Sequence, residues 1–202
     1  NSAQIIVGST STEYVTGIIN YAFTSCSTTE PFDIIAYELP VASAQVKSSI
    51  LLAGLGAAGR TQVIEPKPTR NHTELMLRHF GAEVDVKDLQ GGARSVSLKG
   101  QPELNARNVN VPGDISSAAF PMIASLLTPG SRVTIKGVGI NPLRAGLLEV
   151  LKKMGGSIIL ANKSTEAGEP VADLIVEGSS LKGVTVAPDH APSMIDEYPI
   201  LA

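Results

Sequence analysis

The sequence predicts an α/β fold in which one supersecondary unit occurs twice. Two segments, about 70 to 75 residues apart, follow the same order of strands, helices and turns. In each, a strand ends at a proline (Pro40, Pro112) and a Ser/Ala-rich apolar helix follows. In each, a second amphipathic helix ends at a glycine (Gly81, Gly155) and leads into another strand. β-Branched runs that alternate with amphipathic helices are typical of an α/β protein.

The first copy begins at Ile34 and has clear local signals. Asn71 and Glu74 have the spacing of a capping box at a helix N-terminus. The pair Gly91–Gly92 marks a turn between two strands. The predicted elements are the strand Ile34–Leu39, the helix Ser43–Leu55, the strand Thr61–Glu65, the helix Thr73–Phe80 and the paired strands Glu83–Val86 and Arg94–Leu98.

The second copy opens with a strand at Asn108. The predicted elements are the strand Asn108–Val111, the helix Ile115–Leu127, the strand Arg132–Lys136, the helix Pro142–Met154, the strand Ser157–Leu160, the polar loop Asn162–Pro170 and the strands Asp173–Val176 and Gly183–Val186. Pro188 then repeats the role of Pro40 and Pro112, and a helix is predicted at Met194–Ala202.

These patterns divide the chain into four segments. We expect residues 34–111 to form the first repeat unit, residues 112–187 the second and residues 188–202 the start of a third. Residues 1–33 fit neither copy and stay unassigned. Because the third unit stops inside its first helix, we expect the chain to be a fragment.

Composition excludes several classes of function. The chain has 202 residues, a net charge of −3 and 43% hydrophobic residues, so it can bury a core. The near balance of charge gives no basic footprint for nucleic acid. No apolar run reaches the ~18 residues that span a bilayer. A single cysteine, Cys26, excludes an intramolecular disulfide and fits a reducing, cytoplasmic compartment.

Ser43, Ala44 and Gln45 stand where the first long helix begins. Unpaired N–H groups and the positive end of the helix dipole lie at such a position, and both suit a phosphate or carboxylate. The Ser43 hydroxyl and the Gln45 amide add neutral donors. On spacing alone, an ordinary N-cap is the plainer interpretation.

Two arginines and an acidic pair complete the candidates. Arg70 and Arg144 hold equivalent places before the second helix of each copy, where Arg can bind a phosphate or stay solvated. Asp196 and Glu197 stand where the third unit's helix begins. A carboxylate there can act as a general base or can simply favour the first helical turn. The three histidines and one cysteine show no metal-ligand spacing.

Five runs of residues carry a resemblance to a known family. They are SAQVKSSILLAGL, EPKPTRNHTELMLRHFGAEV, VPGDISSAAFPMIASLLTPGS, GINPLRAGLLEVLKKMGG and APSMIDEYPILA. These runs resemble the 5-enolpyruvylshikimate-3-phosphate synthase family, most closely its glyphosate-tolerant bacterial forms. The resemblance covers Ile34 to Ala202 almost without gaps and does not extend to residues 1–33.

The resemblance implies an inside-out α/β barrel of two lobes, incomplete here, in which each lobe contains three βαβαββ units. It places the two copies in opposite lobes, with helix N-termini facing a cleft. The implied reaction transfers the enolpyruvyl group of phosphoenolpyruvate to the 5-hydroxyl of shikimate 3-phosphate and releases phosphate. It implies no metal or organic cofactor, no nucleic-acid or membrane partner, and a cytoplasmic monomer at full length.

The same resemblance assigns roles to five residues. Ser43, the backbone of Ala44, Gln45 and Arg70 are expected to bind shikimate 3-phosphate. Gln45 is also expected to reach phosphoenolpyruvate. Asp196 is expected to bind the 5-hydroxyl and accept its proton. Other Lys, Arg and Glu groups of the family have no counterpart in this chain, so we expect these 202 residues alone not to turn over.

Two alternatives stay open. One is a catalytically inert half-protein, or a folding unit that binds a partner half, which the unmatched start and the incomplete third unit favour. The other is the sister enolpyruvyl transferase that acts on UDP-N-acetylglucosamine. That family uses a loop cysteine as an acid, whereas Cys26 lies in the unmatched segment.

Overall fold

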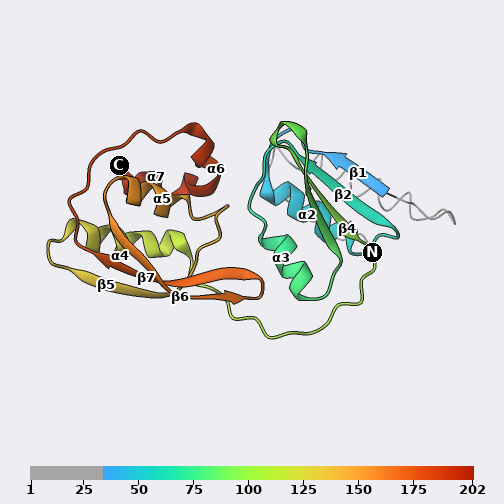
Figure 1. The fold of residues 1–202 in the computed structure, drawn as a ribbon. Helices are drawn as coiled ribbons and strands as arrows, with labels where there is room; N and C mark the ends of the chain where they lie inside the picture. The colour runs from blue at the N-terminus through green and yellow to red at the C-terminus, as the bar shows by residue number, and fades with distance from the viewer. Residues whose placement is uncertain (1–33) are drawn as a thin grey trace. The chain divides into compact units, whose positions relative to one another are not determined.

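A computed structural model describes residues 34–202 of the chain. These residues divide into two compact units, unit 1 (34–107) and unit 2 (108–202). In each unit the two longest helices lie against one sheet (Figure 1). The unassigned segment 1–33, including Cys26, lies outside the described residues.

Unit 1 is a four-stranded sheet with two helices. Its strands follow the order β1-β2-β4-β3, in which β1 is parallel to β2 and the other neighbours are antiparallel. The elements are β1 (Ile34–Glu38), α2 (Ala44–Gly54), β2 (Arg60–Glu65), α3 (His72–His79), β3 (Val84–Asp88), the 3-10 turn η1 (Gln90–Gly92) and β4 (Arg94–Lys99).

The core of unit 1 follows the two-residue alternation of β2. Thr61, Val63 and Glu65 are buried, whereas the residues between them are partly exposed, because successive strand side chains point to opposite faces. Val63 stands opposite Val96 of β4, and both are fully buried. The core consists of Leu39, Ile50, Leu51, Val63, Leu77, Ala82, Val84, Val96 and Leu98.

Gly54 lets α2 rest directly on β2. A Cβ atom at this position would lie 2.6 Å from Oγ1 of Thr61, closer than two such atoms can approach. Any larger residue would therefore push the C-terminal end of α2 away from the sheet. This contact sets the distance between the sheet and the helix whose N-terminus carries Ser43.

Among the described residues, unit 2 repeats the antiparallel part of this topology, without a counterpart of β1. Its sheet has the order β5-β7-β6 with antiparallel neighbours, as β2-β4-β3 has in unit 1. The repeat predicted from the sequence is therefore a repeat of strand order. The elements are α4 (Ile115–Leu127), β5 (Arg132–Gly139), α5 (Gly146–Lys153), β6 (Ser157–Glu166), β7 (Glu169–Glu177), η2 (Pro188–His190), α6 (Ala191–Met194), η3 (Ile195–Glu197) and α7 (Tyr198–Leu201).

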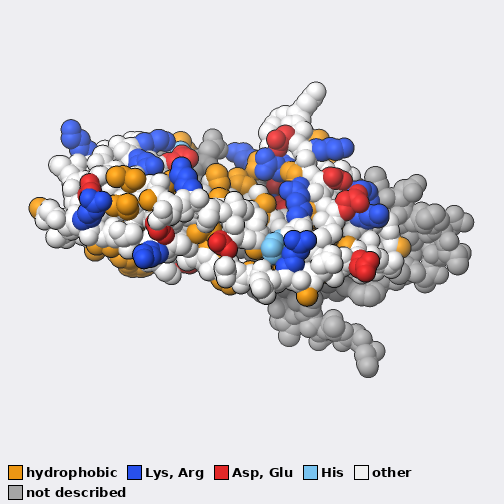
Figure 2. Space-filling model, turned by 60° about the horizontal axis from the view of Figure 1, so that its bottom comes forward, with side chains coloured by type: hydrophobic (Ala, Val, Ile, Leu, Met, Phe, Trp, Pro, Cys, Tyr) orange, Lys and Arg blue, Asp and Glu red, His pale blue; other side chains and the backbone are white. Residues whose placement is uncertain are grey.

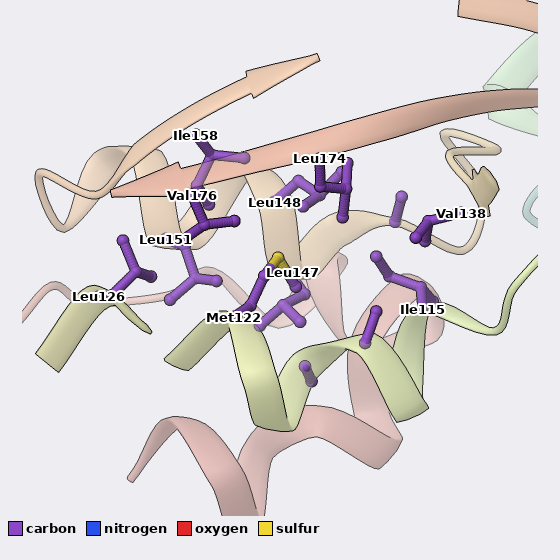
Figure 3. Packing of buried hydrophobic residues seen from close by; sticks show 13 residues of the cluster. Ile115, Met122, Leu126, Val138, Leu147, Leu148, Leu151, Ile158, Leu174 and Val176 are labelled. Carbon is purple, nitrogen blue, oxygen red and sulfur yellow. The ribbon is translucent and has the colours of Figure 1, made fainter. Parts of the chain in front are cut away.

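The core of unit 2 lies between the sheet and the helices α4 and α5. Met122 and Leu126 from α4, Leu147 and Leu151 from α5, and Leu174 from β7 converge there (Figure 3). Each of these side chains is at most 1% exposed. Full burial of one such side chain contributes roughly 1.5–3 kcal/mol, so this cluster holds both helices on the sheet.

Asp173 of β7 closes a bulge in each neighbouring strand. The register of β5 shifts at a bulge that contains Gly137 (φ 64°), and that of β6 at a bulge that contains Asn162 (φ 46°). The Gly137 N–H donates to Asp173 Oδ1 and the Asn162 amide donates to Oδ2, both at 2.8 Å. The Asn162 hydrogen bond, followed by that of Gly137, lowers the pKa of Asp173 below its ordinary value.

The strands of unit 2 are longer than predicted, and the polar loop predicted at Asn162–Pro170 is wrong. β6 continues to Glu166 and β7 begins at Glu169, so Ala167 and Gly168 form a two-residue turn. Their φ angles, 50° and 87°, are those of a hairpin turn with both residues at positive φ. The exposed polar residues of β6 pair through their backbone, which side-chain polarity does not reveal.

Two predicted strands are wrong. Asn108–Val111 and Gly183–Val186 belong to no strand, and most of their side chains are exposed. Beside the first, a single bridge joins Gly113 to Val138 of β5. An alternating pattern favours extended backbone, but a strand also needs a neighbour to bind its N–H and C=O groups. Within residues 34–202 neither segment pairs with another strand.

The helix predicted from Pro142 begins at Gly146 instead. Oδ1 of Asn141 accepts the N–H of Leu143 at 3.0 Å, and the Asn141 carbonyl accepts the N–H of Arg144 at 2.8 Å. These bonds form a separate turn ahead of α5. Arg144 lies in that turn and not in the helix.

The helix predicted at Met194–Ala202 is divided into short pieces. α6 ends at Met194, η3 follows, and α7 begins at Tyr198. Met194 is fully buried, and Ile200 and Leu201 pack against the core of unit 2. In this chain the residues after Pro188 therefore pack on unit 2.

Asp173→Asn is expected to lower the stability of unit 2 at neutral pH and to have little effect in strong acid. When folding lowers the pKa of a carboxylate, the ionised carboxylate stabilises the native state at pH values above its ordinary pKa, here 3.8. That contribution is lost as the pH falls through the lower native value. Urea unfolding of both proteins, followed by circular dichroism from about pH 7 to about pH 2.5, measures the difference.

Asn162→Gly is the matched control. Glycine tolerates the positive φ at this position and removes one of the two donors to Asp173. The difference in unfolding free energy between Asn162→Gly and the double variant Asn162→Gly/Asp173→Asn should therefore depend less on pH than that between wild type and Asp173→Asn. A difference between wild type and Asp173→Asn that is constant over the whole pH range would contradict the account of Asp173.

Candidate functional site

Ser43 caps the N-terminus of α2, as the sequence predicts. Its backbone is extended (φ −143°, ψ 113°), and its Oγ accepts the N–H of Val46 at 3.3 Å. The same hydroxyl donates to Oε1 of Gln45 at 3.4 Å. Ser43 and Ala44 are half-buried and Gln45 is exposed. No acidic residue occupies the first turn, so α2 itself does not neutralise the positive end of its dipole.

One turn further on, Lys47 is the centre of a buried ion cluster. Its Nζ lies 3.2 Å from Oε2 of Glu65, at the end of β2, and 2.7 Å from Oε1 of Glu74, in the first turn of α3. The three side chains are at most 2% exposed. We call Lys47, Glu65 and Glu74 the Lys47 triad. Because buried charges persist only when they are paired, the triad ties α2, β2 and α3 together.

The triad also orders the loop that carries Arg70. Oε2 of Glu65 accepts hydrogen bonds from the N–H of Thr69 at 3.3 Å and from its Oγ1 at 2.6 Å. On the other side of Arg70, the hydroxyl of Thr73 lies 2.7 Å from that of Ser48 in α2. The residues on both sides of Arg70 are thus anchored, Thr69 to Glu65 of the triad and Thr73 to Ser48 of α2.

The capping box predicted for Asn71 and Glu74 is wrong. Asn71 is the N-cap of α3, but its side chain makes no capping hydrogen bond, and Glu74 pairs with Lys47. A buried charge without its partner is destabilising by about 3–5 kcal/mol, whereas a missing cap loses about 1 kcal/mol. The sequence carries one signal for the triad. The alternation of β2 places Glu65 on the same face as the buried Val63, which indicates a buried carboxylate.

In unit 2 a second charged cluster surrounds Asp196. Asp196 belongs to η3, and its side chain is 57% exposed. Its Oδ2 lies 3.5 Å from Nη2 of Arg144. The Nη1 atom of Arg144 lies 2.8 Å from Oε1 and 3.0 Å from Oε2 of Glu197, whose side chain is 1% exposed. The sequence predicts Arg144, like Arg70, as a candidate phosphate ligand, but the structure places it in an internal ion pair with Glu197.

The first turn of α4 joins this cluster. Ser116 Oγ donates to Oε1 of Glu197 and accepts from Nη2 of Arg144. Asp114 caps α4 by accepting the N–H of Ser117 at 2.8 Å and its hydroxyl at 2.9 Å. Burial raises the pKa of Asp114, but the hydrogen bonds from Ser117 and Ser116 and the charge of Arg144 outweigh it and leave this pKa below its ordinary value.

The candidate residues therefore fall into two groups. Ser43, Ala44, Gln45 and Arg70 lie in unit 1, on segments that the Lys47 triad joins. This set suits an anion. Asp196 lies in unit 2, where an exposed carboxylate can accept a proton from a hydroxyl. Their roles as ligands and base stay predictions.

The surface of the described residues is mixed in charge on the face that Figure 2 shows, where Lys and Arg side chains are interspersed with Asp and Glu. Among the described residues, no three or more His, Cys, Asp and Glu side chains are grouped to hold a metal ion. None of the helices in residues 34–202 has the length and apolar character needed to cross a membrane.

Comparison with known proteins identifies the family. Residues 19–202 match the family model described as EPSP synthase (3-phosphoshikimate 1-carboxyvinyltransferase). The chain belongs to the EPSP synthase family. The match starts ahead of Ile34 and so includes residues 19–33 of the segment that fits neither copy of the repeat.

Curated relatives in the EPSP synthase family carry the same name. The 3-phosphoshikimate 1-carboxyvinyltransferase of Gluconobacter oxydans is 61% identical over 168 residues, and that of Acidiphilium cryptum is 60% identical over 168 residues. Each alignment covers 83% of this chain and 38% of the relative. The chain thus spans less than half the length of the curated relatives it matches.

Solved EPSP synthase structures share the fold. The enzyme from Acinetobacter baumannii superposes with a TM-score of 0.81 at 43% identity, over 94% of this chain and 45% of that one. A second structure of the A. baumannii enzyme gives a TM-score of 0.78, over 91% of this chain and 44% of that one. The prediction of an incomplete enolpyruvyl transferase fold is confirmed.

Lys47→Met is expected to destabilise unit 1 by about 3–5 kcal/mol, because it leaves the carboxylates of Glu65 and Glu74 buried without a cation. Lys99→Met is the matched control, since Lys99 Nζ lies 3.7 Å from Glu83 on the surface. Such an exposed pair contributes about 0–1 kcal/mol. Urea denaturation followed by circular dichroism measures both free energies of unfolding, and equal losses would contradict the role of the triad.

Proposed function

We propose that this chain takes part in the transfer of the enolpyruvyl group from phosphoenolpyruvate to the 5-hydroxyl of shikimate 3-phosphate, with release of phosphate. This reaction belongs to the shikimate pathway of aromatic amino acid biosynthesis. The match of residues 19–202 to the EPSP synthase family carries the proposal. Relatives about 60% identical are named for this transferase activity, which gives further support.

The chemistry of the reaction fits the residue types. Both substrates are anions, so they favour helix N-termini and arginine. In the addition step the 5-hydroxyl loses its proton while the methylene carbon of phosphoenolpyruvate gains one. A carboxylate is a suitable acceptor for the hydroxyl proton. The proposed reaction uses no metal and no organic cofactor.

The roles proposed for individual residues follow from this chemistry. Ser43, the backbone of Ala44, Gln45 and Arg70 bind shikimate 3-phosphate, and Gln45 also contacts phosphoenolpyruvate. The cap position of Ser43 and the anchored loop of Arg70 support these roles. Asp196 binds the 5-hydroxyl and accepts its proton, a role that its exposure supports.

We also assign residues 34–111 and 112–187 to two repeat units and residues 188–202 to the start of a third. The shared strand order of the two sheets supports the first two assignments. We further propose that the full-length protein is a cytoplasmic monomer with small anionic substrates and no nucleic-acid partner.

A chimera tests the proposed function. Residues 34–202 replace the matching region of the Gluconobacter oxydans relative, which is 61% identical to this chain. The parent chimera is expected to release phosphate from phosphoenolpyruvate only when shikimate 3-phosphate is present. Asp196→Asn in the chimera is expected to lower kcat about 10²- to 10⁴-fold, because the hydroxyl then lacks its base. A folded but inactive parent would instead favour the inert half-protein.

Arg70→Met tests the binding set separately. Loss of a charged hydrogen bond to the phosphate weakens an interaction worth about 1.5–3 kcal/mol. We therefore expect the KM of the chimera for shikimate 3-phosphate to rise about ten- to hundredfold. Arg94→Met is the control, because Arg94 pairs with exposed Asp88 in the same unit. A KM change for Arg70→Met no larger than that for Arg94→Met would exclude Arg70 as a phosphate ligand.

A further inference from the structure

Arg144 holds the place in unit 2 that Arg70 holds in unit 1, but its guanidinium points into the unit. Its side chain is 13% exposed, and Nη1 lies within 3.0 Å of both oxygens of the buried Glu197 carboxylate. A buried charge pair of this kind orients both side chains, because neither can leave without exposing an uncompensated charge. Glu197 thus sets the orientation of the guanidinium.

The backbone on both sides of this pair is also held. The N–H of Arg144 donates to the carbonyl of Asn141 at 2.8 Å, and the buried Asn141 side chain donates to Oε2 of Glu169 at 3.0 Å. Gly146, two residues after Arg144, has no room for a Cβ atom beside Ser193 of α6. The start of α5, directly after the turn that carries Arg144, therefore packs tightly against α6, which leads into η3.

The other nitrogen of Arg144 serves the exposed side of the cluster. Nη2 donates to Ser116 Oγ and lies 3.5 Å from Oδ2 of Asp196. Ser116 in turn donates to Glu197. The guanidinium is therefore held at Nη1 by a buried group, while Nη2 lies beside the carboxylate of Asp196, which is 57% exposed.

We propose that Arg144 is a positioning residue for Asp196, and that Glu197 and Ser116 hold Arg144 in the orientation that this role needs. The proposal rests on the function proposed above for Asp196. An aspartate side chain can adopt several rotamers. A fixed positive charge beside Oδ2 favours one of them. Catalytic groups must be held to within about 0.5 Å of their productive place by supporting residues of this type.

Arg144→Lys in the active chimera tests the proposal. Lysine keeps the positive charge and can still pair with Glu197, but its single nitrogen cannot hold Glu197 and Asp196 in the same geometry. We expect kcat to fall about ten- to hundredfold, as a misplacement of about 1 Å does. We expect the KM for each substrate to change less than about threefold. Unchanged kcat would overturn the proposal.

Arg132→Lys is the matched control. Arg132 is also in unit 2 and lies 3.1 Å from Glu177, but its side chain is 65% exposed. We expect kcat and both KM values to stay at the level of the parent chimera. An equal fall in kcat for Arg132→Lys and Arg144→Lys would overturn the proposal, because it would show a general sensitivity of unit 2.

A double variant separates positioning from a merely structural role. If Arg144 acts through Asp196, adding Arg144→Lys to Asp196→Asn should lower kcat little further, because the two residues act as one. Full multiplication of the two losses would overturn the proposal. A folded, inactive parent chimera would overturn the proposed function and this inference with it. If the parent chimera is active and Asp196→Asn lowers kcat but Arg144→Lys does not, this inference alone would be overturned.

Nuclear magnetic resonance of the 202-residue chain supplies a readout that needs no activity. Three-bond couplings of Asp196 are expected to show one dominant χ1 rotamer in the wild type and averaged rotamers in Arg144→Lys. Glu197→Gln should have the same effect, because it removes the charge that holds the guanidinium. Rotamer averaging that is already complete in the wild-type chain would overturn the proposal.

Discussion

The ammonium group of Lys47 is the interaction on which the described part of unit 1 depends. It lies where the first turn of α2, the end of β2 and the first turn of α3 meet, and it pairs with a carboxylate from each neighbour. Oε2 of Glu74 is buried without a hydrogen-bond partner, so this carboxylate relies on the ammonium group of Lys47. The segments that carry Ser43 and Arg70 are both positioned by contacts with the Lys47 triad or with the first turn of α2.

Unit 2 has the same order of three antiparallel strands, but different polar residues stand at the equivalent positions. Asp114 caps its first helix, as Ser43 caps that of unit 1, and its loop arginine turns inward to Glu197. One topology thus supports two local chemistries, a neutral, dipole-directed helix end in unit 1 and a carboxylate supported by a guanidinium in unit 2. Function in such a repeat follows the side chains at equivalent positions and not the fold itself.

The fold was largely predictable from the sequence because it depends on periodicity and turn residues, and helix α4 has the bounds Ile115–Leu127 that its apolar run indicated. The hairpin at Ala167 was not predictable from polarity, since its strands pair through backbone groups. The candidate residues were visible at the predicted starts of helices, and their individual roles came from a family resemblance. The buried ion pairs of Lys47 and Glu197 were not predicted, because a charged residue in a helix is expected to be exposed until its partner, distant in sequence, is known.

The paired bulges beside Asp173 have a consequence for how the sheet of unit 2 assembles. Shifting a strand by one residue moves all of its side chains to the opposite face. β5 and β6 each carry a bulge whose position is marked by a bond to the same carboxylate of β7. A slipped pairing on either side would therefore lose a bond at Asp173 as well as its apolar contacts. Asp173 of the central strand thus helps to fix the register of both neighbouring strands, which disfavours misaligned pairing as the sheet forms.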